Sequence, residues 1–222
     1  MYERIIIFTK FPYAGEVKTR LIPTLGSVGA AKLQKEMTLH CIQWARIAVE
    51  QSRAEMEVRF AGGYRNGMFA LFGRDLSYRE QGAGDLGRRL ERAFHDSFEE
   101  GINRSIIVGA DCPMVTAEVM CNALEVLRSK ELVIGPVTDG GYYLIGLSRP
   151  VPHLFRDIPW GTSRVLDKTL ERAQSEGISF QLLETGRDVD LPEDLSVWED
   201  AKLHHSPQKR LSILRKKNTY KS

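Results

Sequence analysis

Ile5-Ile6-Ile7-Phe8 is an unbroken run of β-branched and aromatic residues close to the amino terminus. Such a run predicts a strand that is buried on both faces, as the strands of a parallel sheet are. A second run of this kind, Ser105-Ile106-Ile107-Val108-Gly109, lies near the middle of the chain. Shorter strands are expected at residues 56–60, 76–80, 132–135, 142–147 and 178–183.

Apolar residues at helical spacing occupy the segments between these strands. Helices are expected to begin near Ser27, Thr116, Ser163 and Pro192, where a capping side chain or a first-turn proline precedes an apolar pattern. Two more helices are predicted over residues 64–72 and 86–100. Because strands and helices alternate along the chain, we expect an α/β fold with a mainly parallel sheet that helices cover on both faces.

Length, charge and cysteine content limit the class of protein. The chain has 222 residues and a formal net charge of +2, which suits one large domain and gives no reason to expect nucleic-acid binding. Cys41, Cys112 and Cys121 form no C-x-x-C pair, so a reducing compartment without a zinc site is favoured. No segment has the pattern of a signal peptide or a membrane span, and we therefore expect a cytoplasmic protein.

A domain boundary is predicted near residue 203. Residues 1–203 are expected to form a single nucleotide-binding domain, and residues 204–222 a flexible tail. This tail holds most of the basic excess, in Lys209, Arg210, Arg215, Lys216, Lys217 and Lys221. We interpret the basic cluster as solvated surface.

The loop after the first predicted strand is the first candidate for chemistry, because ligands bind at the carboxyl ends of the strands in an open α/β sheet. It holds Lys10, Gly15, Lys18 and Arg20. Gly15 lets backbone N–H groups approach a ligand closely, and the three cations are suited to phosphate groups. The spacing is not that of a Walker A motif, and a solvated basic loop would have the same composition.

Carboxylates follow two other predicted strands. Asp111 comes directly after the strand at residues 105–109, and Asp188 and Asp190 precede the last predicted helix. Mg²⁺ binds one or two carboxylates together with substrate phosphates, so Asp111 and one of the later pair could hold a metal ion. The alternative is that these residues only cap turns and helices.

Three further segments contain candidate binding residues. Residues 81–87, with the sequence QGAGDLG, could offer backbone groups to a nucleobase. Asp139, Gly140 and Gly141 precede a strand, where the glycines indicate either close approach to a ligand or a tight turn. Trp160 could line an acceptor pocket or seal the edge of the domain. No nucleophile elbow and no H-E-x-x-H motif is present.

Taken in order, these segments resemble the bacterial glycosyltransferase-like family related to 2-phospho-lactate guanylyltransferase. That family belongs to the nucleotide-diphospho-sugar transferase superfamily, whose fold is called GT-A. The matching blocks are residues 8–12 with 15–21, then 84–87, 109–113, 139–147, 160–163 and 188–195. Leu191 stands where the family pattern has threonine.

The resemblance implies a three-layer α/β/α sandwich of the GT-A type, with a nucleotide over the first loop. Its cofactor would be Mg²⁺ or Mn²⁺. The residues implied are Lys10, Gly15, Lys18 and Arg20 for the phosphates; Gln81, Gly84, Asp85 and Gly87 for the base; Asp111 and Asp190 for the metal; and Asp139, Gly140, Gly141 and Trp160 for the acceptor.

We expect metal-dependent transfer from a nucleoside triphosphate or a nucleotide sugar to a small acceptor. In nucleotidyl transfer, the slightly preferred reaction, the acceptor attacks the α-phosphate and pyrophosphate leaves, with Lys18, Arg20 and Asp111 as catalytic residues. In glycosyl transfer the sugar moves instead. A non-catalytic nucleotide-binding domain is the third alternative.

Overall fold

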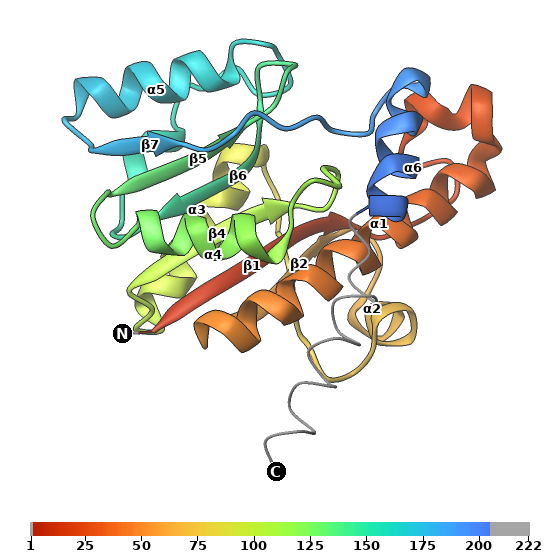
Figure 1. Ribbon diagram of the computed structural model, residues 1–222, viewed down its shortest axis with the longest axis horizontal. Coiled ribbons are helices and arrows are strands. Elements are labelled where there is room, and N and C mark those ends of the chain that lie inside the picture. The colour runs from red at the N-terminus through yellow and green to blue at the C-terminus, as the bar shows by residue number, and fades with distance from the viewer. Residues whose placement is uncertain (1, 205–222) are drawn as a thin grey trace.

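The computed structural model describes residues 2–204, and a seven-stranded sheet forms the centre of this part of the chain (Figure 1). In the order of the sheet, the strands are β3 (Ser77–Glu80), β2 (Glu55–Ala61), β1 (Glu3–Lys10), β4 (Arg104–Gly109), β6 (Tyr142–Leu147), β5 (Leu132–Pro136) and β7 (Phe180–Leu182). β6 runs antiparallel to both of its neighbours, and the other pairs are parallel. The prediction of a mainly parallel sheet is therefore confirmed.

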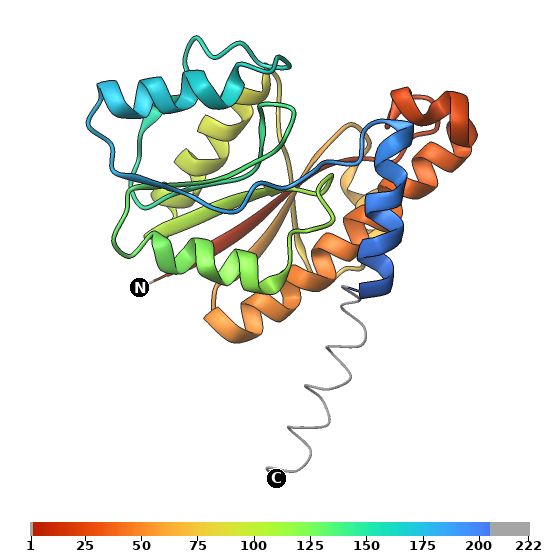
Figure 2. The same cartoon turned by 45° about the horizontal axis from the view of Figure 1, so that its top comes forward.

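Helices cover the sheet on both faces (Figures 1 and 2). The helices on one face are α1 (Ile22–Ser52), α2 (Arg65–Phe72) and α4 (Ala117–Val126), and those on the other are α3 (Leu86–Glu99) and α5 (Val165–Ser175). Short 3-10 turns lie at η1 (Thr19–Leu21), η2 (Pro152–Phe155) and η3 (Pro192–Asp194). The expected three-layer α/β/α sandwich is confirmed.

β1 explains why an unbroken apolar run marks the middle of the sheet. Side chains alternate between the two faces of a strand. Ile5 and Ile7 accordingly pack with α1, α2 and α4, whereas Ile6 and Phe8 pack with α3 and the η2 segment. All four side chains are buried, because each face of this central strand is covered by a helical layer.

The last helix, α6 (Leu195–His204), lies beside the amino-terminal part of α1, away from the sheet (Figure 2). A small apolar cluster holds the two helices together, and its buried members are Leu21, Leu33, Met37, Val189 and Trp198. The cluster joins the first loop, α1, α6 and the segment just before α6. It therefore joins the loop after β1 to the last part of the described chain.

One predicted helix start needs correction, and the helix predicted from Ser27 is preceded by a further turn. α1 begins at Ile22, because Pro23 suits a first helical turn. A break at Gly26, with φ 69° and ψ 164°, separates this first turn from the helix that was predicted. α5 begins at Val165, two residues after Ser163. Thr116 does cap α4, since its side chain accepts a hydrogen bond from the backbone N–H of Val119.

A buried group of charged residues lies on the α3 face of the sheet. The guanidinium of Arg59, which is 1% exposed, pairs with Glu57 on its own strand and with Asp96 of α3 at 2.8 Å. Arg79 of β3 also pairs with Glu57, at 3.1 Å. Removing one partner from such a group leaves an uncompensated buried charge.

We therefore expect Glu57→Leu to lower the free energy of unfolding by about 3–5 kcal/mol. Urea denaturation measures this change. Glu171→Leu is the control, because Glu171 is exposed and pairs only with Lys168; its expected effect is below about 1 kcal/mol. Equal effects of the two substitutions would contradict the prediction.

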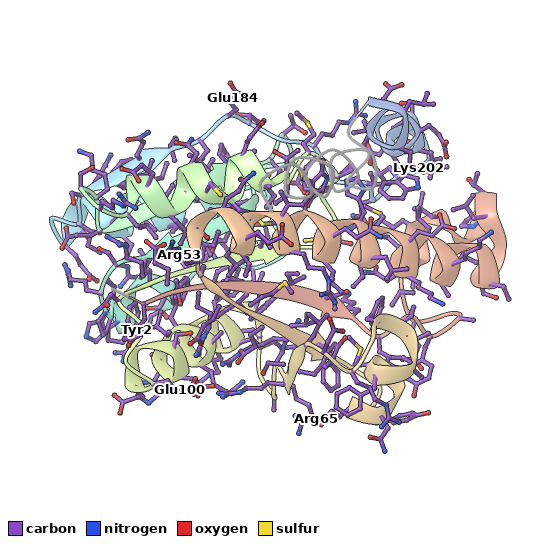
Figure 3. All side chains as sticks on the ribbon, turned by 60° about the horizontal axis from the view of Figure 1, so that its bottom comes forward. Tyr2, Arg53, Arg65, Glu100, Glu184 and Lys202 are labelled. Atoms are coloured by element: carbon purple, nitrogen blue, oxygen red, sulfur yellow. The ribbon has the colours of Figure 1, made fainter. Side chains whose placement is uncertain are left out.

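Different residues lie at the two ends of the sheet, and the proposed ligand-binding segments are at one of them. Tyr2, Arg53 and Glu100 gather at the end where β1 begins, and Arg65 and Lys202 lie toward the opposite end (Figure 3). Because β6 is antiparallel, the β5–β6 connection lies at the same edge as the carboxyl ends of the parallel strands. All the segments proposed from the sequence to bind ligand therefore meet at one edge.

Within residues 2–204, none of the helices is long and apolar enough to cross a membrane. The prediction of a flexible basic tail concerns residues 204–222, and apart from the backbone of the last residue of α6 it lies outside the described residues.

Candidate active site

A cavity of about 480 Å³ opens at the carboxyl ends of β1 and β4, and we call it the central cavity. It brings together several predicted residues with others from β6. The functional side chains and glycines that line it are Lys10, Gln81, Gly84, Asp85, Arg89, Asp111, Tyr142, Tyr143, Trp160 and Asp188. Segments that are far apart in the sequence thus form one site, as the topology of the sheet requires.

A second cavity of about 430 Å³, which we call the side cavity, contains the remaining predicted carboxylates. Its lining comes from Arg20, residues 137–139, and residues 187–194 except Val189 and Pro192. Asp188 lines both cavities. The predicted site is therefore a pair of cavities that share one carboxylate.

Lys18 connects three loops at this site. Its side chain is only 4% exposed, and its Nζ lies 2.5 Å from Oδ1 of Asp111. The same ammonium donates a hydrogen bond of 2.8 Å to the backbone oxygen of Val189, while the N–H of Val189 donates to the backbone oxygen of Asp111. Lys18 has a φ of 48°, and non-glycine residues in this left-handed region often occur at functional sites.

Asp188 and Asp111 each carry an Oδ1 atom that is shielded from solvent. That of Asp111 lies against the ammonium of Lys18, whereas that of Asp188 has no partner within the described chain. Burial above all, and then the charge of Asp111, raises the pKa of Asp188 to about 7, whereas Lys18 acts in the opposite direction. A buried polar atom without a partner calls for an explanation, and a cation beside Asp188 would satisfy this oxygen.

The donor set fits a metal ion that phosphates help to bind. Within residues 2–204, no group of three or more His, Cys, Asp or Glu side chains could hold a metal ion. Mg²⁺ needs fewer protein ligands than that, since it is commonly bound by one or two carboxylates plus substrate phosphates and water. Asp111 and Asp188 have the required chemistry.

Asp190 has a different environment. Its Oδ2 lies 2.5 Å from Nη1 of Arg20, and both side chains are accessible. Asp190 faces the side cavity but does not line the central one. Its predicted role as a metal ligand stays a prediction. Asp188, by contrast, lines the central cavity together with Asp111.

Asp194 holds the segment that carries both of these carboxylates. Its Oδ2 accepts hydrogen bonds from the N–H groups of Asp190 and Leu191, and its Oδ1 accepts one from Nε of Arg187. Although burial acts to raise it, these hydrogen bonds hold the pKa of Asp194 below its ordinary value. Asp194 was missed from the sequence, where Pro192-Glu193-Asp194 indicated only a helix start.

The predicted base-binding segment is tied to α3. Arg89 donates to the backbone oxygen of Gly84 at 2.9 Å, and Arg92 donates to those of Gln81 and Ala83. The Gln81 side chain donates to the backbone oxygens of Thr9 and Arg59, both at 3.1 Å. These hydrogen bonds hold the segment in place. Arg89 is a cavity residue that was not predicted from the sequence. The signal that could have identified it is a cation in the first helical turn after a glycine-rich loop.

Asp85 and Gly87 have local structural roles beside any binding role. Asp85 caps α3 by accepting a hydrogen bond of 2.9 Å from the N–H of Arg88. A Cβ atom at Gly87 would lie 2.6 Å from Nε1 of Trp160. The absence of a side chain at Gly87 therefore allows Trp160 to reach the wall of the central cavity.

The four residues predicted to bind the acceptor do not lie together at one cavity. Asp139 lines the side cavity, and Trp160 lines the central cavity. Gly140 has a φ of 88°, and a Cβ there would lie 2.0 Å from the backbone oxygen of Ser163. The N–H of Gly141 donates to Oδ1 of Asp139. The glycines thus shape the β5–β6 turn, and neither lines a cavity.

Gly15 and Lys10 differ from Lys18 in exposure. Gly15 has a φ of 91° and open space where a Cβ would stand, so its neighbourhood is accessible to a ligand. Lys10 is exposed.

A third cavity, of about 440 Å³, lies between α3 and the segment after β6, and none of the predicted residues lines it.

The fold is that of nucleotide-diphospho-sugar transferases, and solved structures agree on this class. A protein of Desulfovibrio desulfuricans G20, provisionally assigned as such a transferase, is 29% identical over 99% of this chain and 96% of that chain, with a TM-score of 0.83. CMP:2-keto-3-deoxy-manno-octonic acid synthetase, in complex with CTP, is 14% identical over 91% and 98%, with a TM-score of 0.55. A Mycobacterium tuberculosis H37Rv protein, in complex with manganese, is 16% identical over 88% and 97%, with a TM-score of 0.51.

The chain belongs to the DUF2064 family, described as an uncharacterized protein conserved in bacteria, whose profile matches residues 45–162. No curated protein matches its sequence. The closer relation to 2-phospho-lactate guanylyltransferase stays a prediction.

Proposed function

We propose that this chain is a metal-dependent transferase that moves a nucleotidyl group from a nucleoside triphosphate to a small acceptor. One observation carries the proposal: Asp111 and Asp188 both line the central cavity, with Lys18 paired to Asp111 and a shielded oxygen of Asp188 that has no partner within the described chain. The name of the 29%-identical neighbour supports a transferase. The bound CTP and manganese of the two more distant neighbours accord with this chemistry.

Each loop at the central cavity has a part in this proposal. Residues 81–87 and Arg89 face the base and ribose, and Lys10, Gly15 and Lys18 face the phosphates, whereas Arg20 lines the side cavity and pairs with Asp190. Asp111 and Asp188, with Asp190 close by, would hold Mg²⁺ or Mn²⁺. When bound, such an ion offsets the negative charge that develops on the phosphoryl oxygens.

The protein's own residues contribute position and charge. An acceptor oxygen forms a bond to the α-phosphorus, the bond from that phosphorus to the bridging oxygen breaks, and pyrophosphate leaves with the electron pair; the acceptor's proton passes to solvent. Lys10 and Lys18 can stabilise the phosphoryl oxygens, since a charge held in place by the fold, as that of Lys18 is, needs no reorganisation during the reaction. No covalent nucleophile is required.

Glycosyl transfer from a nucleotide sugar is the second candidate, and one observation favours it. Lys18 and Arg20 are each paired with a carboxylate. Of the three cations predicted for the first loop, Lys10 alone makes no ion pair within residues 2–204. This leaves less free positive charge than a triphosphate would use, and a diphosphate needs less.

A thermal-shift screen tests the proposed donor. We expect at least one nucleoside triphosphate or nucleotide sugar to raise the melting temperature, and to do so more with Mg²⁺ or Mn²⁺ than with EDTA. A ligand at 100 times its Kd stabilises the native state by about 2.7 kcal/mol. If no nucleotide had any effect with either metal, the proposal would be wrong.

The products then separate the two reactions. With water in place of the acceptor, slow nucleotidyl transfer releases pyrophosphate and a nucleoside monophosphate. Glycosyl transfer releases a nucleoside diphosphate and free sugar. Tight binding without either product across a wide acceptor panel would instead favour a non-catalytic nucleotide-binding domain.

A further inference from the structure

We infer that the side cavity binds the acceptor, and that this acceptor presents hydroxyl or amino groups and carries no phosphate or carboxylate. The inference rests on the proposed function and names the chemical class of its second substrate. It follows from the position of the side cavity, the pairing of its cations and its surplus of carboxylates.

Position makes the side cavity the place for an acceptor. It adjoins the central cavity at Asp188, which lines both. The residues proposed to face the base, such as Gln81 and Asp85, line only the central cavity. A molecule in the side cavity therefore reaches Asp188 and a metal ion held there without entering the part of the central cavity proposed for the base, and binding both substrates side by side is what such a transfer needs.

Both cations of the side cavity are already paired. Arg20 lies 2.5 Å from Asp190. Arg187 contacts Oδ1 of Asp194 through both Nε and Nη2, each at 2.8 Å. Asp194 also accepts the backbone hydrogen bonds that hold the segment around Asp190. An anionic acceptor would have to break one of these pairs to obtain a guanidinium.

Carboxylates outnumber cations around the same space. Asp139, Asp188, Asp190, Glu193 and Asp194 face Arg20 and Arg187. Asp139 and Glu193 make no ion pair within residues 2–204, and they still face the side cavity when a metal ion is bound at Asp111 and Asp188. A phosphate or carboxylate entering here would lose water and meet charges of its own sign.

Hydroxyl and amino groups match this lining. They donate hydrogen bonds, and carboxylates only accept them. Asp188, Asp139 and Glu193 supply acceptor oxygens on several sides of the cavity. A phosphorylated acceptor, such as the 2-phospho-lactate named in the family resemblance above, would find no unpaired cation in the side cavity to bind its phosphate.

The test uses the full chain and three small probes of one carbon skeleton: glycerol, 2-amino-1,3-propanediol and glycerol 3-phosphate. Nucleotide binding is measured first, by calorimetry with Mg²⁺. Ligand-observed NMR then measures the affinity of each probe for the nucleotide-saturated protein. We expect 2-amino-1,3-propanediol to bind about tenfold more tightly than glycerol 3-phosphate, the effect of one good charge-assisted hydrogen bond.

The variant D139N/E193Q should lower the affinity for 2-amino-1,3-propanediol about tenfold and leave the affinity for the nucleotide unchanged. Glu199→Gln is the matched control, because Glu199 is an exposed carboxylate of α6 outside the cavity. Stronger binding of glycerol 3-phosphate that is lost in Arg20→Gln or Arg187→Gln would overturn the inference. So would the absence of binding by all three probes. Failure of every nucleotide to bind in the first step would instead overturn the proposed function.

Discussion

Asp111→Asn and Asp188→Asn are each expected to lower turnover by about a hundredfold to a thousandfold, with little change in the far-ultraviolet circular dichroism. Each substitution removes one of the two shielded carboxylates that line the central cavity and are proposed to hold the metal ion. The affinity for Mn²⁺, measured by electron paramagnetic resonance with nucleotide present, should fall in parallel. Asp157→Asn is the control, because Asp157 is 90% exposed and lines neither the central nor the side cavity.

The two readouts distinguish a metal ligand from a structural residue. A loss of turnover with unchanged Mn²⁺ affinity would remove the residue from the metal site. Full activity of either variant with Mg²⁺ would contradict the prediction outright. Asp190→Asn belongs in the same series, and a larger loss there than at Asp188 would reinstate Asp190 as the second ligand.

Lys18→Met is expected to weaken the binding of a nucleoside triphosphate about tenfold or more, and that of the monophosphate less. The outer phosphates carry most of the charge, and the buried ammonium of Lys18 is the fixed cation beside Asp111. Isothermal titration calorimetry measures both affinities. Lys32→Met is the control, because Lys32 is 76% exposed on α1.

The same substitution has a structural consequence that must be measured separately. It leaves the backbone oxygen of Val189 without its donor and Asp111 without its counter-ion, which should cost about 1–3 kcal/mol of stability. A loss of stability with equal losses of affinity for mono- and triphosphate would show that Lys18 supports the loops without contacting the outer phosphates.

The fold could be predicted from the sequence because its signals are local. The run at β1 is buried on both faces, and a buried parallel strand needs no further information to be recognised. Thr116 could be assigned as a cap because its hydrogen bond joins residues three apart. The helical turn before Gly26 was not predicted, because the break at Gly26 separates it from the apolar pattern of the longer helix.

The site was predicted only in outline because its pairings are long-range. Side chains two apart on an extended segment point to the same side, so the sequence does not say which of Asp188 and Asp190 shares the central cavity with Asp111. The choice depends on Arg20, which lies 170 residues away in the chain and pairs with Asp190. The burial of Lys18 has the same origin, since composition alone places a lysine in a glycine- and proline-containing loop at the surface.

The apolar cluster of Leu21, Leu33, Met37, Val189 and Trp198 limits how this chain can be re-engineered. The cluster packs the loop that carries Lys18 and Arg20 against the segment that carries Asp188 and Asp190. A truncation that removes α6 would therefore destabilise both of these segments. Circular permutants should place the new termini at the connection after α1, around Arg53, which lies at the opposite end of the sheet (Figure 3). Fusion partners should likewise be attached without shortening the chain inside α6.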